Sequence, residues 1–106
     1  MLGLTFKENV PDLRNSKVAD LVAALERLGH EVTIHDPLAD HEEARREYGL
    51  ALDQEALSRR YDSVVLAVPH AEYLDLGVEG LRALAQEDGT LCDLKGVLGN
   101  AADWTL

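Results

Sequence analysis

The sequence of 106 residues contains a single cysteine, Cys92, so it cannot form an internal disulfide. It has no apolar run near the roughly 18 residues that a membrane-spanning helix needs. Residues 1–7 lack the long apolar core of a signal peptide. These absences exclude a disulfide-stapled scaffold and a membrane-embedded protein. We therefore expect a cytoplasmic protein.

Positive charge is also scarce. Lysine and arginine number 10 against 20 acidic residues, which gives a formal net charge of -10. A general nucleic-acid or membrane-surface binder needs clustered basic side chains to offset phosphate charge. We therefore expect neither nucleic acid nor membrane as a partner. A single anionic ligand needs only a few local donors, so the overall charge does not exclude a nucleotide.

Signals for metal binding and nucleophilic catalysis are missing as well. The histidines form no H-x-x-x-H pair, and no cysteine cluster supports them. Cys92 lies in an expected strand without an electropositive motif, which predicts a buried and inert thiol. No serine has the flanking glycines that would expose a nucleophile. We expect no metal site and no catalytic residue. The four histidines are His30, His35, His41 and His70.

The sequence does carry an alternation of strand and helix patterns, which predicts one α/β domain with a mainly parallel sheet. Ser16 is the expected N-cap of a helix to about Leu28, and Gly29 is expected to end it. Further helical patterns cover 40–48, 53–59 and the region around Leu81, Leu84 and Ala85. Expected strands cover 2–5, 31–35, 50–52, 63–68 and 90–93, and we expect an irregular tail over 100–106.

The most informative segment for function is Leu2 to Arg14. It leaves the first strand at the carboxyl edge of the sheet and leads to a helix N-terminus, where anionic ligands are favoured. Lys7 and Arg14 supply positive charge there. The alternative is that they are solvated loop charges paired with Glu8 and Asp12. The glycines do not distinguish these two interpretations, because the segment has no G-x-G-x-x-G fingerprint.

Two polar residues at other strand ends also have two interpretations each. His70 follows the buried 63–68 strand, so it either faces a ligand or caps the next helix. Asp36 ends the second strand, where an acidic residue often contacts a ribose in dinucleotide-binding domains. Because Pro37 follows it, an ordinary strand-ending turn is the favoured interpretation of Asp36.

The run G-L-T-F-K-E-N-V-P-D-L-R-N-S over 3–16 resembles the start of the C-terminal, UDP-binding domain of the UDP-glucose/GDP-mannose dehydrogenase family. The resemblance continues through 32–37, 61–70 and 93–98, and it covers essentially the whole chain. It implies a Rossmann-like three-layer α/β fold with a mainly parallel sheet. The first block looks most like the branch that oxidises UDP-N-acetylhexosamines for polysaccharide synthesis, with UDP-glucose as the alternative substrate.

The resemblance implies roles for four positions. Phe6 and Lys7 match a Phe-Lys pair that contacts the nucleotide-sugar. Lys95 matches or neighbours a basic site for the UDP portion, although Gly96 stands where some members carry arginine. Arg14 matches an arginine that reaches the NAD cofactor, which is bound mainly by another domain.

The rest of the family's catalytic apparatus is not in this sequence. Family members oxidise an alcohol to a carboxylate with two NAD and a cysteine nucleophile from a central region, which this chain lacks together with the N-terminal dinucleotide-binding domain. The first strand looks truncated. We therefore expect 1–106 to be a single UDP-binding domain, a fragment inactive by itself. Its expected partners are the UDP-sugar and the other domains of a homodimeric enzyme.

A free-standing α/β binding module, or a receiver-like regulatory module, is the alternative. A phosphoacceptor domain needs an acidic cluster at the strand ends and a lysine on a late strand. Asp36, Asp93 and Lys95 imitate this arrangement loosely, but the first strand has no acidic pair at its end. Phosphotransfer from acetyl phosphate would distinguish the two hypotheses.

Overall fold

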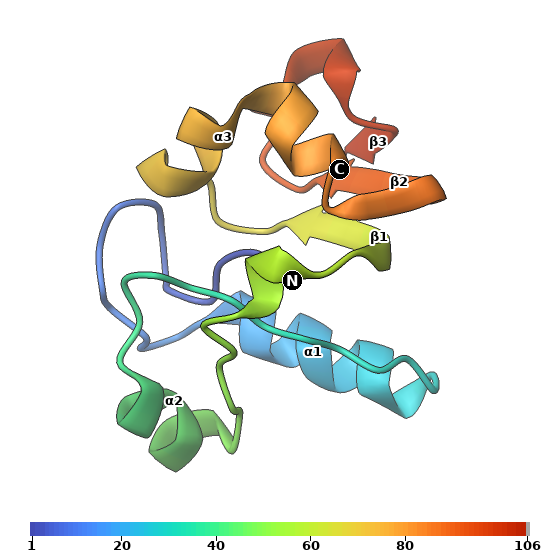
Figure 1. Ribbon diagram of the computed structural model, residues 1–106. Coiled ribbons are helices and arrows are strands. Elements are labelled where there is room, and N and C mark those ends of the chain that lie inside the picture. Colours follow the sequence, from blue (N-terminus) through green and yellow to red (C-terminus); the bar gives the residue numbers. More distant parts are fainter. Residues whose placement is uncertain (106) are drawn as a thin grey trace.

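The computed structural model describes residues 1–105 and shows a central sheet with helices on both sides (Figure 1). The α-helices are α1 (Lys17–Arg27), α2 (His41–Tyr48) and α3 (Ala71–Arg82). Two short 3-10 helices are η1 (Ala56–Ser58) and η2 (Gly99–Ala101). The strands are β1 (Tyr61–Leu66), β2 (Ala85–Asp93) and β3 (Trp104–Thr105). None of the helices in 1–105 is long and apolar enough to cross a membrane.

The sheet is parallel throughout, and the chain does not visit its segments in spatial order. β1 pairs with β2, and β2 pairs with β3. Parallel bridges extend the sheet on the other side of β1: Leu2 pairs with both Leu66 and His35, and Ile34 pairs with Leu52. Numbered along the chain, the segments lie in the order 3-2-1-4-5-6, which is the order of a Rossmann-like sheet. The predicted α/β fold is confirmed.

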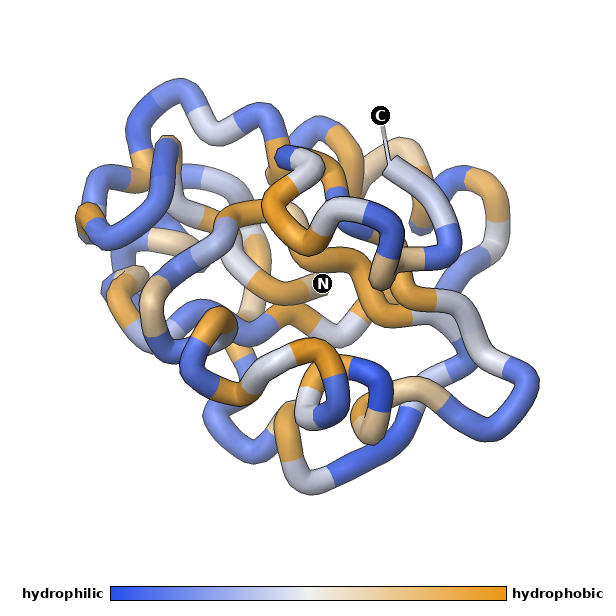
Figure 2. Tube along the Cα trace, turned by 90° about the horizontal axis from the view of Figure 1, so that it is seen from above, coloured by the Kyte–Doolittle hydropathy of each residue, from blue (hydrophilic) through white to orange (hydrophobic). Residues whose placement is uncertain are grey.

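Apolar side chains on the two faces of the sheet form two separate cores. Along β1, Val64 and Leu66 pack with Tyr73 and Leu81 of α3, whereas Val65 packs on the opposite face. That opposite core contains buried residues of α1 and α2. Figure 2 shows hydrophobic stretches through the middle of the molecule and hydrophilic ones over most outer loops. The result is three layers, with α1 and α2 on one face and α3 on the other (Figure 1).

The boundaries of α1 follow the signals in the sequence. The Ser16 hydroxyl oxygen accepts the Ala19 N–H at 3.3 Å, and this bond caps the helix as predicted. After the C-cap, Gly29 has a φ of 95°, a left-handed value that favours glycine. The predicted helix over 40–48 is confirmed as α2, which the Asp40 carboxylate caps at the Glu43 N–H.

Several predicted elements need correction. The strands expected over 31–35 and 50–52 are limited to bridges at Ile34, His35 and Leu52, and the strand expected over 90–93 begins earlier, at Ala85. The first strand is limited to a bridge at Leu2, because the N–H groups of Leu4 and Thr5 donate to the Asp36 carboxylate instead of to a neighbouring strand. The helix expected around Leu81, Leu84 and Ala85 is only partly right: α3 spans Ala71–Arg82 with a kink at Gly77, and Ala85 is the first residue of β2. The tail is not wholly irregular, since β3 pairs with the end of β2. Leu106 lies outside the described residues.

Candidate functional site

The candidate site lies at the topological switch point of the sheet, between the Leu2 segment and β1, where the strand order reverses. The Leu2 segment is flanked by His35 on one side and by Leu66 on the other, and the two neighbours lead to helices on opposite faces. In open parallel sheets, ligands bind beyond the carboxyl ends of the strands at this position. The loop 5–12 leaves the sheet at this edge.

The loop 5–12 is closed on itself by its own hydrogen bonds. The Phe6 N–H donates to the Asp12 carbonyl at 2.6 Å, and the Thr5 hydroxyl donates to the Lys7 carbonyl at 3.0 Å. These bonds leave the side chains of the tip free to face solvent. Phe6 is 53% exposed, although phenylalanine is usually buried, and Lys7 is exposed beside it.

Arg14 lies at the far end of this loop with its side chain 83% exposed. Its Nε and Nη2 donate to the two carboxylate oxygens of Asp12 at 3.1 and 3.0 Å. Those hydrogen bonds hold the pKa of Asp12 below its usual value. The loop-charge interpretation is thus correct for the pairing of Arg14 with Asp12. Lys7 forms no ion pair with Glu8 or with any other residue of 1–105.

Lys95 lies at the same edge of the sheet, in the turn that follows β2. Asp93 is fully buried and shapes that turn: its Oδ1 accepts the Gly96 N–H at 3.0 Å, and its Oδ2 accepts the Leu98 N–H at 2.7 Å. Gly96 has a φ of 71°. The Leu94 N–H donates to the Leu66 carbonyl at 3.1 Å, so the turn starts beside the end of β1. Lys7 and Lys95 are therefore exposed at strand ends on the two sides of β1.

Asp36 is buried, and its carboxylate accepts hydrogen bonds from within the protein. Its Oδ2 accepts the N–H groups of Leu4 and Thr5 at 2.7 and 3.1 Å. Its Oδ1 accepts those of Leu38 and Ala39 at 2.8 and 3.2 Å. The strand-ending turn, which was the favoured interpretation, is confirmed. A carboxylate held in this way faces inward and is not available to a ribose.

His70 completes this buried network. Its Nε2 lies 2.9 Å from the Asp36 Oδ2 and 3.2 Å from the Thr5 hydroxyl oxygen, and its Nδ1 accepts the Asn9 N–H at 2.9 Å. Because a backbone amide can only donate, Nδ1 carries no proton and Nε2–H donates to Asp36. Burial alone would raise the pKa of Asp36, but the bonds from His70 and from backbone N–H groups lower it to about 2.

Asn9 joins the loop to α3. Beside its backbone bond to His70, its side-chain Oδ1 accepts the N–H of Ala71, the first residue of α3, at 2.8 Å. Asn9 has a φ of 64°, a left-handed value that asparagine tolerates better than most residues. One interpretation of His70 was that it caps α3. His70 is the residue before α3, but the side chain that caps the helix is that of Asn9. Sequence reasoning missed this pairing, and only the turn-forming character of Asn9 hinted at it.

The acidic residues do not form a phosphoacceptor cluster. Asp36 and Asp93 are both buried, and each carboxylate oxygen accepts a backbone N–H. A phosphoacceptor carboxylate has to meet its donor in solvent, so the receiver-like alternative is not favoured. Cys92 is buried as predicted, and burial raises the pKa of its thiol.

The strand order, the three layers and the cation-bearing loop at the switch point together define a Rossmann-like domain of the nucleotide-binding class. Residues 1–100 match the UDP-glucose/GDP-mannose dehydrogenase family, UDP binding domain. The chain belongs to this family, and the resemblance found in the sequence is confirmed.

Curated relatives agree with this assignment. The chain is 43% identical over 98 residues to the UDP-N-acetyl-D-glucosamine 6-dehydrogenase of Salmonella typhi, and 42% identical over 98 residues to the enzyme of that name from Pseudomonas aeruginosa. It is 39% identical over 100 residues to Protein CapL of Staphylococcus aureus. These alignments cover 92%, 92% and 94% of the chain. The chain spans 23% of the length of each relative.

Proposed function

We propose that this chain is the part of an NAD-dependent nucleotide-sugar 6-dehydrogenase that holds the UDP portion of its substrate. The substrate class is a UDP-N-acetylhexosamine or UDP-glucose, which the whole enzyme oxidises to the uronic acid. The observation that carries the proposal is the exposed Phe6–Lys7 pair on a closed loop at the switch point of a Rossmann-like sheet. Two relatives named as UDP-N-acetyl-D-glucosamine 6-dehydrogenases support the N-acetylated substrate.

The charges of this edge suit a diphosphate. Lys7 and Lys95 are exposed cations on two sides of β1, in a chain whose formal net charge is -10. The first N–H of α3 is already bonded to Asn9, so the two lysines have to supply much of the attraction for an anion. The exposed Phe6 ring offers an apolar surface for the uridine or the sugar.

Residues 1–105 could contact NAD at its periphery, but they do not form its main binding site. The turn after the Leu2 segment is not a glycine-rich phosphate loop, since Thr5, Phe6 and Lys7 follow Leu4 there. Arg14 is exposed and reaches outward, so it fits a cofactor that another domain holds. NAD supplies the hydride acceptor of the reaction, and we place its main site in an N-terminal domain. With the other domains absent, the isolated chain is inactive.

The remaining features of the proposal rest on the family resemblance. We propose a cytoplasmic enzyme of polysaccharide synthesis that acts as a homodimer. In that enzyme the UDP-sugar lies between this domain and the central region that carries the nucleophile.

An NMR titration of the ¹⁵N-labelled chain with UDP, UDP-N-acetylglucosamine and NAD tests the proposal. We expect UDP and the UDP-sugar to shift the signals of Phe6, Lys7 and Lys95. Lys7→Ala should weaken UDP binding by about 10-fold or more, because a hydrogen bond to a charged group contributes about 1.5–3 kcal/mol. Arg27→Ala removes the same charge from an exposed position at the C-terminal end of α1, away from this edge of the sheet, and should leave the affinity unchanged. Equal losses in the two variants, or no UDP shifts at millimolar concentration, would contradict the proposal.

A further inference from the structure

Two hydrogen bonds of Asn9 span a long stretch of sequence. Its N–H donates to the His70 Nδ1 at 2.9 Å, and its side-chain Oδ1 accepts the Ala71 N–H at 2.8 Å. Within the described part of the chain, these are the hydrogen bonds that join 6–11 to residues outside the loop. The tip of the loop therefore depends on Asn9 for its attachment to α3.

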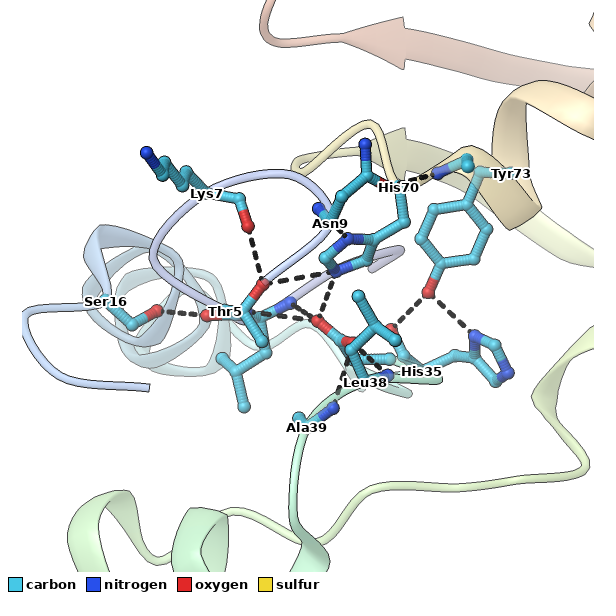
Figure 3. Close-up of polar contacts among 12 residues, drawn as sticks. Thr5, Lys7, Asn9, Ser16, His35, Leu38, Ala39, His70 and Tyr73 are labelled. Atoms are coloured by element: carbon cyan, nitrogen blue, oxygen red, sulfur yellow. Dashed lines mark hydrogen bonds and ion pairs between the residues drawn. The ribbon is translucent and has the colours of Figure 1, made fainter. Parts of the chain in front are cut away.

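The other end of this attachment is rigid. His70 has no exposed surface, and both of its ring nitrogens have hydrogen-bond partners. Asp36 orients the imidazole and also accepts the N–H groups of Leu4 and Thr5, where the loop begins. One buried network thus holds both the base of the loop and its tip (Figure 3).

Asn9 adds nothing to either apolar core. It is exposed, and it lies two and three residues after the exposed Lys7 and Phe6. Binding a ligand with a mobile loop costs the entropy of ordering that loop, and a loop ordered beforehand avoids this cost. The contacts of Asn9 order the segment that carries the proposed UDP contacts.

We propose that Asn9 is a positioning residue: it latches the loop 5–12 onto His70 and the N-terminus of α3, so that Phe6 and Lys7 are already in place when UDP binds. This inference rests on the proposed function of the same loop. We call these two contacts of Asn9 the loop latch. Asn9 does not itself have to touch the ligand.

The chain offers a matched pair of substitutions to test the loop latch. Asn9→Gly removes the Oδ1 acceptor without backbone strain, because glycine adopts a φ of 64° freely. Asn15→Gly is the control: Asn15 has a φ of 57°, is exposed, and makes no side-chain hydrogen bond within 1–105. Asn9→Asp is the conservative variant, since a carboxylate oxygen can still accept the Ala71 N–H.

The first measurement is ¹⁵N relaxation of the ligand-free variants. We expect the order parameters of Phe6 and Lys7 to fall in Asn9→Gly from rigid-backbone values of about 0.85 towards about 0.6. They should stay at the wild-type level in Asn15→Gly and return to it in Asn9→Asp. The urea midpoint of unfolding should fall only slightly in Asn9→Gly, as expected when one helix cap is lost, and should stay near the wild-type value in the other two variants, because no core contact is lost.

The second measurement is the affinity for UDP, taken from the same titration as above. Asn9→Gly should bind UDP about 3- to 10-fold more weakly, the loss expected from one hydrogen bond. Unchanged affinity, or weaker binding without any loss of loop order, overturns the inference. If the wild-type chain binds UDP and Asn9→Gly binds it equally well, the latch alone is refuted. If the wild-type chain does not bind UDP, the proposed function fails, and this role of Asn9 fails with it.

Discussion

Replacing Asp36 by asparagine should destabilise the domain in a way that depends on pH. The carboxylate accepts N–H groups on both oxygens, from Leu4 and Thr5 on one and from Leu38 and Ala39 on the other. An amide has one oxygen, so its NH₂ group must face one pair of buried donors. A buried donor without a partner costs about 1–3 kcal/mol, so we expect a loss of about 2–4 kcal/mol at pH 7.

The sign of the pH effect follows from the direction of the Asp36 pKa shift. The pKa falls from 3.8 to about 2 on folding, so the ionised carboxylate stabilises the folded state above the unfolded pKa. At about 1.4 kcal/mol per pKa unit, the full contribution is about 2 kcal/mol. It is lost as pH falls towards the folded pKa, and about 1 kcal/mol of it is gone by pH 3.

Urea unfolding followed by far-UV circular dichroism, at pH 7 and at pH 3, measures this contribution. Other carboxylates titrate in the same range, so the informative quantity is the difference in unfolding free energy between wild type and Asp36→Asn. That difference should shrink by about 1 kcal/mol between pH 7 and pH 3. Asp75→Asn, an exposed carboxylate on α3, should show no such change. A difference that is equal at the two pH values would refute the assignment of the low pKa to Asp36.

Three further predictions concern other positions. Gly3→Ala should lower the unfolding free energy by more than about 2 kcal/mol in the same urea assay, because residue 3 has a φ of 98° and an added Cβ would lie 2.5 Å from the Val68 Cβ. Cys92 should react with a thiol reagent such as DTNB only after urea is added, because the thiol is buried and burial raises its pKa. Asp12→Asn should leave the urea midpoint unchanged, because its pair with Arg14 is solvent-exposed and screened; a clear drop would show that this pair stabilises the loop.

Local signals in the sequence predicted most of the elements. Ser16 and Gly29 bound α1, because caps depend on neighbouring residues. The apolar run over 64–68 identified the buried strand β1, although β1 itself spans Tyr61–Leu66 and not 63–68. β3 was missed since two residues form it, and only their pairing with Cys92 and Asp93 makes them a strand. No local pattern reports such a pairing.

The site was predictable in location but not in its internal arrangement. The switch point and the exposed Lys7 follow from strand order and from the resemblance to a family. Asp36 was expected in a turn, but its bond to His70 joins residues far apart in sequence. The same holds for Asn9 and Ala71. Partners of this kind are set by the packing of the whole sheet, so a single sequence without structure does not pair them.

The place of Leu2 in the middle of the sheet has a consequence for the order in which the chain folds. Both of its sheet neighbours, His35 and Leu66, are synthesised after it. The Leu2 segment therefore forms its sheet hydrogen bonds only after both neighbours have been made. Each parallel pairing also needs a crossover, which makes the contacts non-local and the folding slow. We therefore expect that a nascent chain ending before β1 leaves one edge of the Leu2 segment unpaired, and that such shortened chains aggregate more readily than the chain of 106 residues.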